Sequence, residues 1–142
     1  MSSLTVTYQH SLNDDFGRLR LAVETGDFAG RGGFWVQWQD VEEFADSLSV
    51  YPLRAANPPS ARWGFEKFEG DDLIIALEVR PANARGTLLV SIEIADDFDP
   101  GQRVRVVFTT HYPQLEAFRQ ELVKVMQRQA RYSFQNLART SP

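Results

Sequence analysis

The chain has 142 residues, of which 43% are hydrophobic and 12% aromatic, with a formal net charge of −4 and no cysteine. The lack of cysteine excludes disulfides, thiolate catalysis and Cys-ligated metal centres, and it favours a reducing, cytoplasmic location. We predict a single domain over residues 1–142, with roughly the last ten residues as a loose tail. Apolar runs are short and the N-terminus has no basic or apolar stretch, so we expect neither a membrane span nor a signal peptide.

The charge is distributed unevenly along the sequence. Residues 1–102 hold 8 Lys and Arg against 17 Asp and Glu, whereas residues 103–142 hold 7 against 2. An acidic body disfavours nucleic acid, because affinity for phosphate backbones comes mainly from basic side chains. The basic end has a structural explanation, since Lys124, Arg128 and Arg131 fall near the end of a predicted helix, where cations stabilise the helix dipole. We therefore expect no nucleic-acid partner.

Apolar residues at every second position predict strands along most of the chain. In chain order, the alternating segments are 4–8, 18–23, 34–39, 63–68, 73–80, 88–94 and 103–108. The loops between the later segments are of hairpin length and rich in Pro, Gly, Asn and Asp, which favours antiparallel pairing.

Two segments change to helical spacing. The first begins at Asp40 and Glu43, which have the form of a capping box, and Pro52 stops it. The second runs from about residue 112 to 129, with Pro113 in its first turn. Their apolar stripes are Val41, Phe44, Ala45 and Leu48 in the first helix, and Leu115, Phe118, Leu122 and Val125 in the second. The predicted fold is α+β, a mainly antiparallel sheet of six or seven strands with both helices packed on one face, in the order βββα-ββββα.

The same patterns predict which large side chains are buried. The apolar face of the sheet and the two helical stripes should form one core. We expect Trp35 to be substantially more exposed than Trp38. The expected core comprises Trp38, Phe44, Leu48, Phe108, Phe118 and Leu122.

Residues that could carry catalysis are scarce. The two histidines, His10 and His111, are too far apart in the sequence for a metal-ligand spacing. Acidic pairs such as Asp96-Asp97 fall in predicted turns or in the first turn of a helix, where carboxylates stabilise the backbone. The glycine-rich stretch 26–33 opens into a strand and lacks a Lys-Ser/Thr ending, so it predicts a hairpin or bulge with positive φ angles. We therefore predict no enzyme activity and no catalytic, cofactor-binding or metal-binding residues.

The solvent face of the predicted sheet holds a candidate partner-binding surface. A tryptophan among arginines has the composition of a protein-binding hot spot. The candidate residues are Arg18, Arg20, Trp35, Arg103 and Arg105. The plain alternative is a solvated face with cross-strand ion pairs. An alternative function is small-molecule binding by an α+β domain whose sheet curls around an aromatic-lined cavity, with Trp63, Phe65 and Phe68 as its lining.

Several motifs resemble a pattern found in small bacterial proteins. They are F-x-G-R-G-x-F-W-V at 28–36, D-V-E-E-F-A-x-x-L at 40–48, Y-P-L at 51–53 and T-x-Y-x-x-L-E-x-F-x-x-E-L at 110–122. Some of these proteins are grouped with WapI-type immunity proteins, which neutralise a contact-dependent toxin encoded beside them. The resemblance implies a protein-binding module with a cognate toxin as partner, and it assigns no active-site residues. An acidic surface would suit a basic toxin domain.

Overall fold

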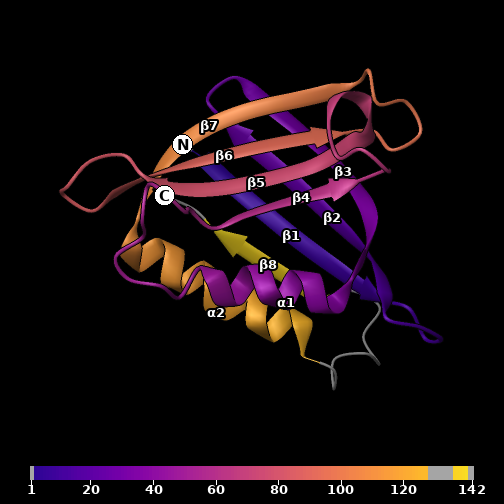
Figure 1. The fold of residues 1–142 in the computed structure, drawn as a ribbon, viewed down its shortest axis with the longest axis horizontal. Coiled ribbons are helices and arrows are strands. Elements are labelled where there is room, and N and C mark those ends of the chain that lie inside the picture. Colours follow the sequence, from indigo (N-terminus) through magenta and orange to yellow (C-terminus); the bar gives the residue numbers. More distant parts are fainter. Residues whose placement is uncertain (1, 128–135, 141–142) are drawn as a thin grey trace.

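The computed structural model describes residues 2–127 and 136–140. Its strands form two four-stranded antiparallel sheets, in the orders β3-β2-β1-β8 and β4-β5-β6-β7. The strands of the first sheet run across those of the second, and the two helices lie beside each other along one side of the strands (Figure 1). The first sheet contains β1 (Ser2–His10), β2 (Phe16–Thr25), β3 (Phe28–Gln37) and β8 (Asn136–Thr140). The second contains β4 (Ser60–Gly64), β5 (Leu73–Pro81), β6 (Thr87–Ala95) and β7 (Arg103–His111). The helices are α1 (Trp38–Ser47) and α2 (Tyr112–Met126), and η1 (Gly70–Asp72) is a short 3₁₀ turn.

The α+β class, the antiparallel pairing and the two helices are confirmed, but the prediction of a single sheet is wrong. Alternation shows which face of a strand is buried and does not show which strand it pairs with. Here β3 ends the first sheet, and β4 pairs with β5 instead of with β3. The predicted order is also incomplete, because β8 follows α2 and pairs with β1, within the stretch expected to be a tail.

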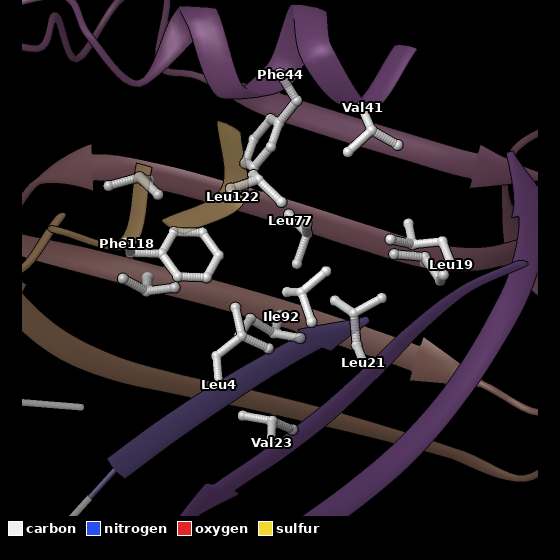
Figure 2. Close-up of a cluster of buried hydrophobic side chains, with 14 of the residues drawn as sticks. Leu4, Leu19, Leu21, Val23, Val41, Phe44, Leu77, Ile92, Phe118 and Leu122 are labelled. Atoms are coloured by element: carbon white, nitrogen blue, oxygen red, sulfur yellow. The ribbon is translucent and has the colours of Figure 1, made fainter. Parts of the chain in front are cut away.

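One cluster of buried side chains joins both sheets and both helices. Figure 2 shows Leu4 and Leu21 of the first sheet, Ile92 of the second, and Phe44 and Phe118 of the helices directed toward a common centre. The predicted core residues Phe44, Leu48, Phe108, Phe118 and Leu122 are all buried.

Trp38 is partly buried at the edge of the core. It is the first residue of α1 and not the last inward residue of β3, as the alternation had suggested. Its indole Nε1 donates a hydrogen bond to Asp15 Oδ1 at 3.2 Å. The predicted capping box is wrong for the same reason, because α1 starts two residues before Asp40 and its N-cap, Gln37, makes no side-chain capping bond.

The second helix begins as predicted, with Pro113 in its first turn. Lys124 lies in its last turn, as expected for a cation near a helix C-terminus. Arg128 and Arg131 lie outside the described residues.

The glycines of β3 set the spacing between the two sheets. A Cβ atom at Gly30 would collide with the side chain of Val104, and one at Gly32 would lie 2.7 Å from Ile94 Cγ2. Both positions therefore allow close approach of β3 to the second sheet. Within the stretch 26–33, a positive φ occurs only at Gly26, in the β2–β3 turn, so the expected conformational role holds there and not along β3.

Candidate functional site: the outer face of the first sheet

Three of the predicted site residues share the outer face of the first sheet. Side chains alternate between the two faces of a strand, so Arg18 and Arg20 point away from the core that Leu19 and Leu21 enter. Arg18 is directly opposite Trp35 on β3. Trp35 is 53% exposed, which confirms the expected contrast with the partly buried Trp38.

The structure adds Arg31 to this surface. Arg31 is opposite Ala22, and Gly33 is opposite Arg20, so all of these lie on the same outer face. We refer to Arg18, Arg20, Arg31 and Trp35 as the Arg–Trp face. Its two central arginines, Arg20 and Arg31, are both exposed.

A groove of about 560 Å³ lies over this face. Its floor includes Ala22, whose small side chain leaves a hollow between larger neighbours, and Gly33, which the side chains of Arg18 and Arg20 cover. Thr5 and Thr7 of β1 line one side, and the β6–β7 loop, residues 96–102, supplies the other. The groove is thus formed by the first sheet together with a loop of the second.

An ion pair holds the β6–β7 loop against the first sheet. Arg18 Nη1 donates to Asp97 Oδ2 at 2.8 Å, and the two side chains are only 19% and 13% exposed. A Cβ atom at Gly33 would lie 2.5 Å from the Leu19 carbonyl oxygen and 3.3 Å from Arg18 Nε. The glycine therefore leaves space in which the Arg18 side chain lies above β3.

The same loop presents an aromatic side chain to solvent. Phe98 is 92% exposed and lies among the residues that line the groove. Its backbone N–H donates to Asp96 Oδ1 at 2.9 Å, and the loop is closed by a 2.9 Å bond from Asp96 N–H to the Gln102 carbonyl. These bonds fix the local turn, so Phe98 stands at the rim of the groove without being folded into the core.

The two remaining candidates, Arg103 and Arg105, lie on the second sheet and are not part of the Arg–Trp face. Arg103 has a structural role: it donates to Glu93 Oε2 at 2.6 Å and to the carbonyls of Pro100, Gly70 and Leu73 at 3.1 Å. Arg105 is 76% exposed and lies 3.4 Å from the other oxygen of Glu93. The predicted five-residue surface is therefore divided between two sheets.

Replacing Arg103 by alanine is expected to lower the free energy of unfolding by about 1–3 kcal/mol, because it removes the closer of the two cations paired with Glu93 and leaves three backbone carbonyls without this donor. Arg105→Ala should change it by less than about 0.5 kcal/mol, since that side chain is mostly exposed. Urea unfolding followed by circular dichroism measures both. Equal effects of the two substitutions would show that Arg103 is not a structural residue.

The described residues do not form the aromatic-lined cavity of the alternative prediction. Trp63 packs edge-to-face against Phe44, with ring centroids 6.4 Å apart, while Phe65 and Phe68 are 45% and 46% exposed. The interior void between the sheets and the helices measures about 30 Å³, whereas small-molecule pockets are usually about 300–1,000 Å³.

The titratable groups do not converge on a reaction centre within the described residues. His10 packs edge-to-face on Tyr8, and His111 is exposed where β7 meets α2. Hydrogen bonds from Arg119 and Gln120 lower the pKa of Glu116 to about 2, and Glu116 in turn raises the pKa of Arg119. This is an ion pair along the surface of α2. No group of three or more His, Asp and Glu that could hold a metal ion occurs in the part of the chain that the structure describes.

Sequence reasoning missed Arg31, Phe98 and the groove itself. Arg31 was hidden in the glycine-rich stretch, although its spacing of four from Trp35 already places both on one face of a strand. Nothing local connects Phe98 with β2, because the loop reaches the sheet through a contact 79 residues apart in the sequence.

Of the described helices, neither is long and apolar enough to cross a membrane. Searches of protein-family models, curated proteins and solved structures found no match to this chain.

Proposed function

We propose that this protein is a non-catalytic protein-binding module of immunity-protein type, which captures a cognate toxin domain through the Arg–Trp face. The observation that carries the proposal is the half-exposed Trp35 beside a groove with arginines and a fully displayed Phe98. Tryptophan and arginine are the residues most enriched in binding hot spots. The resemblance of the sequence motifs to WapI-type immunity proteins supplies the class of partner.

The physical support comes from exposure and rigidity together. Covering a large, exposed aromatic side chain with a partner lowers the free energy of the complex, because apolar surface leaves water. A side chain that the sheet already holds in place loses little conformational entropy when it is covered. Trp35 lies near the C-terminal end of β3, opposite Arg18, which Asp97 already fixes in place. Binding at such a preorganised surface requires little rearrangement of the module.

The proposal predicts a toxin gene beside the gene for this protein, and the toxin domain that it encodes is the test partner. Co-expression of the wild-type chain should restore growth of cells that make the toxin domain, and the two should co-purify at micromolar concentration. Trp35→Ala is expected to weaken binding at least about 30-fold, corresponding to a hot-spot loss of about 2 kcal/mol. Death of the cells that express the wild-type chain, with no association at micromolar concentration, would refute the proposal.

Arg85→Glu is a matched control for charge reversal on the face. Arg85 is exposed in the β5–β6 loop, and its side chain forms no hydrogen bond or ion pair with the described residues. Arg20→Glu should reduce capture of the toxin domain, and Arg85→Glu should leave it unchanged. Thermal unfolding of each variant, which should match the wild type, separates lost binding from lost folding.

A further inference from the structure

We infer that the groove on the Arg–Trp face binds an acidic, extended segment of its partner, by accepting side-chain carboxylates between Arg20 and Arg31. This inference rests on the proposed function and names the chemistry that the same surface recognises. It also gives the binding face a charge opposite to that of the chain as a whole, whose net charge is −4, and so replaces the expectation that an acidic surface meets a basic toxin domain.

The floor of the groove is made by two neighbouring rows of residues on the first sheet. Thr7, Arg20 and Gly33 form one row across β1, β2 and β3, and Thr5, Ala22 and Arg31 form the next. The two arginines thus occupy diagonal corners, and the two small residues occupy the others. Diagonal neighbours on a sheet lie about 7–8 Å apart, so Arg20 and Arg31 flank the Ala22 corner of the groove, while the side chains of Arg18 and Arg20 cover the Gly33 corner.

The three arginines of the Arg–Trp face differ in whether a carboxylate neutralises them. Arg18 is neutralised by Asp97, but neither Arg20 nor Arg31 forms an ion pair or side-chain hydrogen bond with any residue in the described part of the chain. Two neighbouring like charges are unfavourable on a sheet, and Glu24, which is diagonal to Arg31, forms no ion pair with it among the described residues. An incoming carboxylate removes this repulsion and accepts charge-assisted hydrogen bonds from the planar guanidinium groups. The hydroxyls of Thr5 and Thr7 line the groove as further donors.

Carboxylates at the edges of the groove favour a short acidic segment over a long polyanion. Glu24 is exposed on the same face, in the row beyond Ala22, and Asp96 stands at the loop side of the groove. These carboxylates lie at the edges of the basic area, so a nucleic-acid strand that leaves the groove would meet negative charge. A protein segment with two or three acidic side chains fits within the bounds. Its extended backbone matches a groove that lies over strands.

The test uses isothermal titration of the purified full chain with an acetylated hexaglutamate peptide at low ionic strength. We expect saturable binding that weakens as salt is added. Arg20→Gln and Arg31→Gln should each weaken it at least about fivefold, since each removes a charge-assisted hydrogen-bonding group. Arg85→Gln, on the β5–β6 loop, should leave the affinity unchanged. A hexalysine peptide of the same length should not bind.

Three results would overturn the inference: no saturable binding of hexaglutamate, equal loss of affinity in the Arg85→Gln control, or equally tight binding of a six-nucleotide single strand of thymidine. The last would show that the groove binds anions without preferring carboxylate to phosphate. Failure here with retained, Trp35-dependent toxin capture would leave the proposed function standing. Peptide binding without any toxin capture would refute the function but not the chemistry of the groove.

Discussion

Replacing Phe118 by alanine is expected to lower the free energy of unfolding by about 3–5 kcal/mol. Phe118 is 5% exposed and projects from α2 toward Leu4 and Leu122 in the shared core (Figure 2). It already lines the interior void of about 30 Å³, so truncation would enlarge an existing cavity instead of creating an isolated one. The rigid sheets around it limit collapse, which places the cost toward the upper part of that range.

Urea unfolding followed by circular dichroism measures this loss. Phe28→Ala is the matched control, because it removes the same side chain from a surface position that is 68% exposed. We expect that substitution to cost less than about 1 kcal/mol. An unchanged unfolding midpoint for Phe118→Ala would show that α2 presents a different face to the core.

Replacing Gly30 by valine is expected to lower the free energy of unfolding by about 2–3 kcal/mol through overpacking. Even the Cβ atom would collide with Val104, so the first sheet must move away from β7 or Val104 must leave its rotamer. The two sheets approach each other at this glycine. Moving them apart would loosen the packing of the core, because residues of both sheets line it.

Ala29→Val is the control for the Gly30 substitution. Ala29 is the preceding residue of β3 and is exposed on the outer face, so added methyl groups should change stability by less than about 0.5 kcal/mol. Chemical denaturation of both variants separates the two positions. A Gly30→Val chain as stable as the wild type would contradict the close packing of β3 against the second sheet.

Much of the fold follows from local pattern. The alternation at Leu19 and Leu21 placed their side chains inward, and the helical spacing at Phe44 and Phe118 placed both helices against the core. Strand pairing is different, because it depends on contacts between distant segments. The short connection from β4 to β5 favours their antiparallel pairing, but nothing around β4 indicates that β3 is left at the edge of another sheet.

The candidate site shows the same division. Arg18, Arg20 and Trp35 share a face because of their spacing in neighbouring strands, and that could be predicted. Arg103 has the same alternating position, yet its side chain holds the carbonyls of two loops. Hydrogen bonds of that kind connect residues about 30 positions apart, and no sequence pattern distinguishes them from a solvent-exposed arginine.

Amide chemical-shift mapping of the isotope-labelled chain with the neighbouring toxin domain locates the binding surface most directly. We expect the largest perturbations at residues 18–22, 31–35 and 96–98, which form the Arg–Trp face, its groove and the Phe98 loop. Trp35→Ala should abolish them at the same protein concentrations. Perturbations confined to α2 or to the outer face of the second sheet, around Arg105, would contradict the assignment of this face as the binding surface.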